Sequence, residues 1–412
     1  MRRIRLRSIL WRIFEAWLLS ALVTAAALMG ISKIRKLLRG DEATGRFPRL
    51  EPLTSDVGRG DVATTYMSGD RLYADMLAAI EGARERVLFE TYIIKGDETG
   101  RRFKDTLVAA AQRGVDVRVV YDGFANLVVD PRFLRFPAPV KVLRYPVFNA
   151  GWQIFNPRRW GRDHRKILVV DDEVGFVGGY NIGALYEASW RDTHVRLRGD
   201  AVWDLANAFI DFWNIHRAHD KMPSAGSPTW QPFVRAHRNV PRQLVFPIRG
   251  MYLEAIDRAS RHIRMTAAYF IPDHDILAAL QDARGRGVEV DIIVPKVSNH
   301  VLADWLSRGF YGDLLRAGVR LHQYENAMVH AKTATIDGSW STVGTANIDR
   351  LSLSGNYEIN LEVIDERLAR DLEEAFETDL GNCTELTLHE WQQRDVVARA
   401  CEILLRPLRP LL

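Results

Sequence analysis

The amino-acid sequence predicts an α/β protein built from two similar lobes, each a mixed sheet flanked by helices. The chain has 412 residues, which exceeds the usual size of a single hydrophobic core. Apolar runs typical of strands alternate with segments of helical spacing, which is the pattern of a sheet with helices on its faces. This order occurs twice along the chain, and a short motif of the same composition closes each copy. We therefore expect a duplicated lobe.

The first copy follows a polar connector over residues 40–70. Helical spacing covers 72–83 and 102–113, apolar strand runs cover 87–94, 115–121, 166–170 and 174–177, and an aromatic-rich helix covers 200–217. In the second copy, 252–260 matches the first helix, 263–271 the first strand, 278–288 the segment 107–115, and 288–294 the second strand. The predicted organisation is an anchor with basic flanks (1–40), a first lobe (60–217), a Pro, Ser and Gly-rich linker (218–240), a second lobe (241–380) and an amphipathic tail (381–412).

The motif that closes each copy contains His, Lys, Asp, Gly and Asn at identical spacings. The first reads His164, Lys166, Asp171, Gly178 and Asn181, and the second reads His330, Lys332, Asp337, Gly344 and Asn347. An acid follows 28 residues after each histidine, Asp192 in the first copy and Glu358 in the second. So many matched positions do not recur by chance in one chain.

The residue types in this motif suit displacement at phosphorus. A His-x-Lys sequence on a strand would place both side chains on one face, because side chains alternate along a strand. Two lobes facing each other would bring both histidines into one cleft. One histidine can then attack phosphorus as a nucleophile, while the other protonates the leaving oxygen and later deprotonates the incoming one.

The remaining motif residues have predicted supporting roles, and the site needs no metal or cofactor. Phosphate oxygens would be bound by Lys166, Lys332, Asn181 and Asn347. The acids Asp192 and Glu358 would accept from the other ring nitrogen of the histidines and fix the tautomer. We interpret Asp171 and Asp337 as turn residues after a strand. A zinc site is disfavoured because a lysine two residues after each histidine would repel a cation.

A structural alternative exists for each of these residues taken singly. A lone histidine beside a buried strand is more often a satisfied core residue than a catalytic group. The glycines could simply permit a tight backbone path. Duplication in register, with amide and acid matched, favours the catalytic interpretation for the His, Lys and Asn pairs.

Residues 16–32 carry no charge and predict a membrane-associated helix. These 17 residues would span about 25 Å, against a hydrocarbon core of about 30 Å. We favour an uncleaved anchor, and a cleaved signal peptide and an in-plane amphipathic helix remain alternatives. Basic residues flank both ends, so the side of the membrane that faces the lobes is not predicted.

Composition and charge restrict the function classes. Hydrophobic residues make up 47% and charged residues 26%, as in a folded globular protein. The formal charge of +4 is small, and the arginines gather at the N-terminus, at residues 158–162 and in the tail. This distribution favours an anionic surface over a nucleic-acid partner. The two cysteines, Cys383 and Cys401, form neither a disulfide framework nor a zinc motif.

The duplicated motif resembles that of the phospholipase D superfamily, over about residues 60–375. Details resemble bacterial cardiolipin synthases: Phe89-Glu90-Thr91-Tyr92, Asp163-His164-Arg165-Lys166, the run 190–199 and the run 356–360. The resemblance implies that His164 forms a phosphohistidine and that His330 is the general acid and base. Thr345 stands where serine is commoner, and one apolar segment stands where many such enzymes carry two or none. These departures leave the chemistry intact and the membrane topology open.

The expected function is phosphatidyl transfer that makes cardiolipin from two phosphatidylglycerols, with release of glycerol. Hydrolysis of phospholipid headgroups by the same intermediate is the alternative, and a membrane-tethered phosphodiesterase or nuclease comes third. A non-catalytic scaffold is the weakest alternative, because both half-sites are complete. The expected partners are anionic phospholipid and the membrane surface, and the expected location is the bacterial cell membrane. Oligomeric state, headgroup specificity and acyl specificity remain open.

Overall fold

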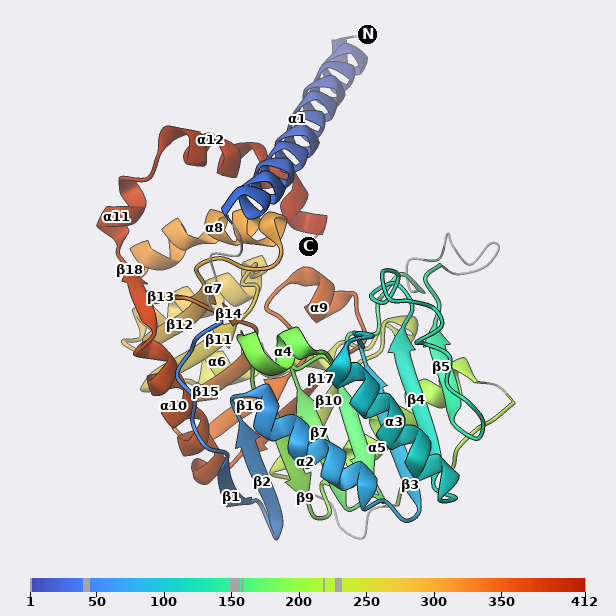
Figure 1. Ribbon diagram of the computed structural model, residues 1–412. Helices are drawn as coiled ribbons and strands as arrows, with labels where there is room; N and C mark the ends of the chain where they lie inside the picture. Colours follow the sequence, from blue (N-terminus) through green and yellow to red (C-terminus); the bar gives the residue numbers. More distant parts are fainter. Residues whose placement is uncertain are drawn as a thin grey trace.

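The computed structural model describes residues 2–39, 45–148, 156, 159–217, 219–226 and 232–411. Two eight-stranded mixed sheets lie in separate lobes, with helices on their faces (Figure 1). The predicted fold class of two similar α/β lobes is therefore confirmed.

The first sheet has the strand order β1-β2-β9-β7-β6-β3-β4-β5. Its strands are β1 (Leu53–Val57), β2 (Asp61–Tyr66), β3 (Arg86–Thr91), β4 (Asp116–Asp122), β5 (Lys141–Tyr145), β6 (Ile167–Val170), β7 (Val174–Gly178) and β9 (His194–Arg198). The pairs β3–β4 and β4–β5 are parallel, and the remaining neighbours are antiparallel.

The second sheet has the order β10-β17-β16-β15-β11-β12-β13-β18 and repeats the first from β2 to β5. Its strands are β10 (Val234–Asn239), β11 (His262–Ala267), β12 (Glu289–Pro295), β13 (Arg320–Tyr324), β15 (Lys332–Ile336), β16 (Trp340–Gly344), β17 (Glu358–Ile364) and β18 (Cys383–Leu386). Two short strands, β8 (Trp190–Arg191) and β14 (Met328–Val329), pair in parallel and join the lobes.

Helices cover the outer faces and also fill the space between the sheets. The first lobe contributes α2 (Gly69–Glu81), α3 (Glu98–Gln112), α4 (Ala184–Ser189) and α5 (Val202–His216). The second contributes η3 (Pro241–Gln243), α6 (Pro247–Arg258), α7 (His274–Gly285), α8 (Val301–Arg316), α9 (Arg350–Ser354) and α10 (Glu366–Leu380). The tail forms α11 (Leu388–Gln392), α12 (Val396–Leu404) and η4 (Arg406–Leu411).

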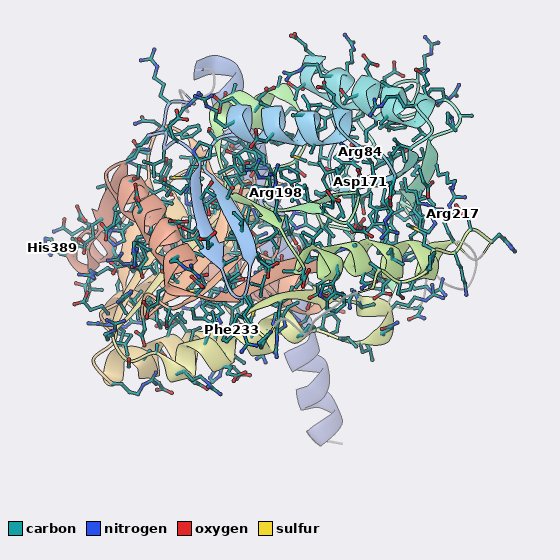
Figure 2. All side chains as sticks on the ribbon, turned by 90° about the horizontal axis from the view of Figure 1, so that it is seen from below. Arg84, Asp171, Arg198, Arg217, Phe233 and His389 are labelled. Atoms are coloured by element: carbon teal, nitrogen blue, oxygen red, sulfur yellow. The ribbon has the colours of Figure 1, made fainter. Side chains whose placement is uncertain are left out.

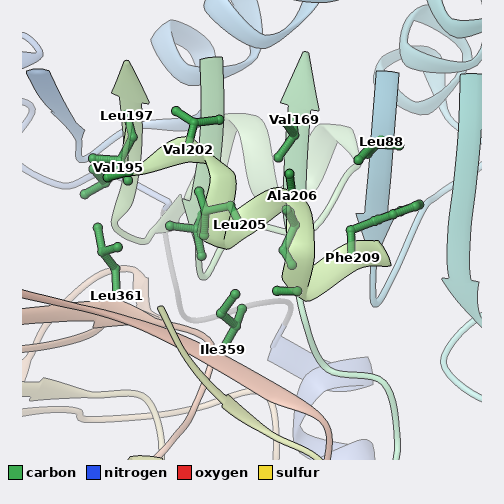
Figure 3. Packing of buried hydrophobic residues seen from close by; sticks show 14 of the residues in the cluster. Leu88, Val169, Val195, Leu197, Val202, Leu205, Ala206, Phe209, Ile359 and Leu361 are labelled. Carbon is green, nitrogen blue, oxygen red and sulfur yellow. The ribbon is translucent and has the colours of Figure 1, made fainter. Parts of the chain in front are cut away.

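The helix α5 packs between the two sheets and makes one continuous core across the lobes. Leu205 and Phe209 of α5 lie between strands of the first sheet and the side chains of Ile359 and Leu361 on β17 (Figure 3). All four side chains are 1% exposed or less. Because close-packed interiors deform little, this shared core holds the two half-sites in a fixed relation.

Two segments predicted as connectors contain strands. The strands β1 and β2 lie within residues 40–70, and β10 lies within the predicted linker 218–240. β10 reads Val-Arg-Ala-His-Arg-Asn and has low apolar content, because most of its length is only partly buried. A half-exposed strand of this kind gives a weak hydrophobic signal. Residues 40–44, 218 and 227–231 lie outside the described residues.

The predicted membrane segment is part of one long helix, α1 (Arg2–Arg39), which projects away from the lobes (Figure 1). Residues Glu15–Ile34 are long and apolar enough to cross a membrane, and only 11% of that window is buried. In the middle of α1, Ala21 and Ala25 pack against Leu306 of α8 and Leu405 and Leu408 of the tail. The anchor thus docks on the second lobe through a narrow face.

Candidate active site

Each motif histidine is held in place by the backbone of the opposite lobe. The N–H of His164 donates to the carbonyl of Tyr357 (3.0 Å), and the N–H of His330 donates to the carbonyl of Arg191 (2.7 Å). The expectation that each histidine lies on a strand was wrong, because β6 begins after Lys166 and β15 begins at Lys332. The histidines lie at the interface between the lobes. There, backbone hydrogen bonds between the lobes take the place of hydrogen bonds between the strands of one sheet.

The two predicted acids bind the histidines in a crossed arrangement. Nδ1 of His164 lies 2.9 Å from Oε2 and 3.0 Å from Oε1 of Glu358. Nδ1 of His330 lies 2.6 Å from Oδ2 of Asp192. The acid that follows one histidine in the sequence therefore serves the other histidine. In their ionised forms the two acids only accept hydrogen bonds, so each Nδ1 then carries the proton and each Nε2 keeps its lone pair.

Both motif lysines fold back onto their own histidines and are buried. Nζ of Lys166 donates to the carbonyl of His164 (2.6 Å). Nζ of Lys332 donates to the carbonyl of His330 and lies 3.0 Å from its Nδ1. Each lysine is only 2% exposed. The Nζ atoms of the two lysines are thus held beside the two histidines.

The two predicted asparagines lie at equivalent places and have different partners. Oδ1 of Asn181 accepts from the N–H of Ile93 (3.2 Å), and among the described residues its NH₂ group donates to no protein acceptor. Oδ1 of Asn347 is buried and has no hydrogen-bond partner in the described part of the chain. Because a buried amide normally finds partners, both side chains are available to a ligand.

Burial shifts the pKa values of the acids and of the lysines of the site in opposite directions. It raises the pKa of Glu358 to about 8 and that of Asp192 to about 6. It lowers the pKa of Lys166 to about 7 and that of Lys332 to about 8.

Burial also lowers the pKa of both histidines well below the ordinary value, and the neighbouring lysines lower it further. Lys332 acts on His164 and Lys166 acts on His330, so the two half-sites form one electrostatic unit. An anionic phosphate at this point would favour the cationic forms again.

Aromatic rings flank both histidines, and sequence reasoning gave them no role. The ring of Tyr92 meets His164 edge-on at 4.7 Å, and Nζ of Lys166 lies 5.2 Å from its centroid. Trp190 lies 4.9 Å from the ring of His330, and Tyr269 lies 6.4 Å from it. Tyr92 and Trp190 were visible only as parts of longer motifs, and Tyr269 had no sequence signal.

A second group that sequence reasoning missed is the hydroxyl of Thr345. Its Oγ1 donates to Oε2 of Glu358 at 2.5 Å and fixes that carboxylate against His164. The equivalent position in the first copy is Gly179, where a Cβ atom would overlap the carboxylate of Asp192. Glu358, the longer acid, is thus held by a hydroxyl group, whereas Asp192, the shorter acid, packs directly on the backbone of Gly179.

The motif aspartates are structural, as predicted. Asp171 accepts from the N–H groups of Arg84 (2.9 Å), Glu85 (2.8 Å) and Arg86 (2.9 Å), and Figure 2 labels it beside Arg84. Asp337 likewise accepts from the N–H groups of residues 260–262 (2.7–2.9 Å). Both have positive φ, +53° and +55°, which aspartate tolerates in turns. They tie each motif strand to the preceding loop.

Comparison with known proteins decides the family. Residues 76–211 and 252–380 match the family model described as "Cardiolipin synthase, PLD-like domain". The chain belongs to this family. It is therefore an enzyme of the phospholipase D superfamily, of the phosphatidyltransferase type.

Two curated members of the cardiolipin synthase family show the extent of the similarity. The major cardiolipin synthase ClsA of Bacillus subtilis is 34% identical over 351 residues, which cover 82% of this chain and 72% of that protein. A cardiolipin synthase of Staphylococcus aureus is 32% identical over 361 residues, which cover 84% and 73%. A solved phosphatidylserine synthase of Haemophilus influenzae has the same fold, with a TM-score of 0.65, 13% identity and coverage of 89% and 96%.

Proposed function

We propose that the protein joins two phosphatidylglycerol molecules into cardiolipin and free glycerol through a phosphohistidine on His164. The observation that carries this proposal is the crossed arrangement of two histidine–carboxylate pairs, with Nδ1 of each histidine engaged by a carboxylate. One catalytic histidine must be a nucleophile and the other an acid, and both roles use the remaining Nε2 atom.

In the first half-reaction, Nε2 of His164 attacks the phosphorus of one phosphatidylglycerol. The bound anionic phosphate holds His330 in its cationic form, with a proton on both ring nitrogens. The bond from phosphorus to the headgroup glycerol oxygen breaks, and Nε2–H of His330 gives its proton to that oxygen. Free glycerol leaves, and the phosphatidyl group stays on His164. The side chain of His164 is 13% exposed and that of His330 is 5% exposed, which supports His164 as the group that meets the substrate phosphorus.

In the second half-reaction, the terminal hydroxyl of a second phosphatidylglycerol attacks the phosphohistidine. Nε2 of His330, now unprotonated, takes the hydroxyl proton, and the bond from phosphorus to His164 breaks. The product carries two phosphatidyl groups on one glycerol. Lys166, Lys332, Asn181 and Asn347 bind the non-bridging phosphate oxygens and stabilise the charge that develops in both transition states.

The second acceptor could be water, which would give hydrolysis instead of transfer. The relatives named cardiolipin synthases support transfer, and so do the aromatic side chains of Tyr92, Trp190 and Tyr269 around the histidines. A site that excludes water protects a reactive intermediate from hydrolysis.

The test is a product assay with the purified full-length protein and phosphatidylglycerol vesicles. Mass spectrometry should find cardiolipin and glycerol in equal amounts and an alkali-stable, acid-labile phosphatidyl adduct on the peptide that contains His164. Phosphatidic acid as the main product would replace transfer by hydrolysis. An adduct on His330 instead would reverse the two histidine roles.

The helix α1 supports placement at the cell membrane, and we include this in the proposal. Between the exposed charged residues Glu15 and Lys33, its exposed side chains are apolar, with Leu19 and Val23 each more than half exposed. Protease treatment of sealed vesicles should cleave the lobes from one side only, which identifies the side that holds the active site. Full release of the protein by high salt would argue against insertion of α1.

A further inference from the structure

A cavity rich in arginine lies beside α8, next to the contact of that helix with α1. It has a volume of about 260 Å³ and is enclosed by α8, α11, α12 and η4. Six arginines and two acids line it. The arginines are Arg308, Arg316, Arg394, Arg399, Arg406 and Arg409. This excess of positive charge in a concave site has no role in the proposed chemistry.

Three of the arginines form ion pairs within the cavity wall, and two of these share one carboxylate. Arg308 and Arg394 both pair with the buried carboxylate of Glu402, at 3.1 Å and 2.9 Å. Arg316 pairs with Asp313 on the same helix. The two acids of the cavity are therefore already engaged.

The other three arginines lack an acidic partner. Arg399 donates to the carbonyl of Gln392. Within the described part of the chain, Arg399, Arg406 and Arg409 form no ion pair with a carboxylate. Six guanidinium groups thus share one cavity with only two carboxylates, and this excess of positive charge makes a site for an anion.

The guanidinium of Arg409 is fixed by its surroundings. It lies directly on Gly309 of α8, where a Cβ atom would overlap it, and its Cζ is 4.7 Å from the ring centroid of Phe310. Burial and the nearby charge of Arg406 lower the pKa of Arg409. A positioned guanidinium beside another cation is stabilised when an anion enters between them.

The cavity adjoins the apolar layer that α1 and the tail present to solvent. Leu306 of α8 contacts α1, and Gly312 of the cavity lies six residues further, about 9 Å along the helix. On α12, Val396 and Val397 are 77% and 67% exposed, and Ile403 is 52% exposed and also lines the cavity. Figure 1 shows α1, α8 and α12 together on one side of the molecule.

We propose that this cavity binds the phosphodiester headgroup of an anionic membrane lipid, at a site separate from the catalytic histidines. Guanidinium groups bind phosphate oxygens in pairs. The volume suits a headgroup, and the exposed apolar residues of α12 and α1 provide a surface for the acyl chains. The proposal rests on contact with the membrane through α1 and does not rest on the transfer reaction.

Hydrogen–deuterium exchange on the detergent-solubilised full-length protein tests this site locally. Dihexanoyl phosphatidylglycerol should slow exchange in the peptides spanning 305–316 and 388–409. In the variant Arg406→Gln/Arg409→Gln, the lipid concentration for half-protection should rise at least about tenfold. Protection around 162–167 and 328–333, beside the catalytic histidines, should persist in that variant. The matched control is Arg71→Gln/Arg258→Gln, which removes two exposed arginines elsewhere and should behave as wild type.

Three results would overturn the proposal. One is absence of protection in the cavity peptides while the catalytic peptides are protected. A second is equal protection by neutral dihexanoyl phosphatidylcholine. The third result concerns the source of the anion. If the cavity binds lipid, Ile403→Ser should weaken protection by the lipid and leave protection by inorganic phosphate unchanged. If phosphate alone protects as well as the lipid and Ile403→Ser has no effect, the cavity binds free phosphate and not a lipid. Thermal unfolding checks that each variant is folded.

Discussion

Nδ1 of His330 lies 2.6 Å from Oδ2 of Asp192, although the residues are 138 positions apart and belong to different lobes. The equivalent bond joins His164 to Glu358, 194 positions away. Each half of the duplicated chain thus supplies a histidine to one pair and a carboxylate to the other. This exchange leads to the first prediction.

Asp192→Asn should lower kcat for cardiolipin formation by about 10²–10⁴-fold with a small effect on KM, because an amide can donate to Nδ1 and hold His330 in the wrong tautomer. Initial rates on phosphatidylglycerol vesicles measure the effect. Asp171→Asn, which removes a carboxylate far from the histidines, is the matched control and should keep its kcat. A wild-type kcat in Asp192→Asn would show that His330 does not depend on this carboxylate.

His164→Ala should abolish transfer, with a loss of at least about 10³-fold, and should leave the fold intact. The histidine side chain makes its bonds to Glu358 at the interface between the lobes and contributes little to the central core. Product analysis and thermal unfolding of the same preparation check the two parts. Wild-type-like turnover in this variant would exclude His164 as the nucleophile.

The pH profile of kcat/KM should be bell-shaped. As the pH falls, Glu358 (pKa about 8) and then Asp192 (pKa about 6) become protonated and no longer orient His164 and His330 as carboxylates. Above their pKa values of about 7 and 8, Lys166 and Lys332 lose the charge that binds phosphate. Activity should therefore be highest between about pH 7 and pH 8 and fall on both sides.

A control for the acidic limb is available in the same chain. Burial also raises the pKa of Asp304 to about 6, but its side chain bonds to the N–H of Ser298 and not to a motif histidine. Asp304→Asn should leave the acidic limb in place. A shift of that limb in Asp304→Asn would transfer the assignment from Asp192 to Asp304.

Asp337→Ala should destabilise the fold by about 2–3 kcal/mol, because three backbone N–H groups lose a charged acceptor. Burial alone would raise the pKa of Asp337, but the hydrogen bonds from residues 260–262 outweigh it and lower the pKa below 3.8. Its contribution to stability is therefore complete above pH 3.8 and is lost as the pH falls further.

Denaturant unfolding of wild type and Asp337→Ala at several pH values measures this contribution. The stability difference should be constant from about pH 6 to 7 and shrink below the ordinary carboxyl pKa. A difference that grows on acidification would contradict the assigned role. Transfer activity of the folded fraction should stay unchanged, since Asp337 does not touch the histidines.

The sequence predicted the lobes and the motif residues because both are local patterns. Periodicity located the strands β3, β4, β6 and β7 but not β5, and fixed spacing identified His164, His330 and the acids. The pairing of acid with histidine could not be predicted, because identical spacing in both copies is compatible with either partner. Thr345 was noted only as a departure from serine, yet its hydroxyl positions Glu358. Such roles depend on contacts between residues, which one sequence does not contain.

The pairing of β8 with β14 beside the histidines has a consequence for how such a site is assembled. A lobe alone would hold an imidazole with no carboxylate at Nδ1, so two separate lobes would complete each other only at concentrations that favour their encounter. Within one chain, the effective concentration of each lobe for the other is set by the connection and not by expression level. A substitution at Asp192 in the first lobe therefore acts first on His330 in the second lobe, so the two lobes cannot change independently.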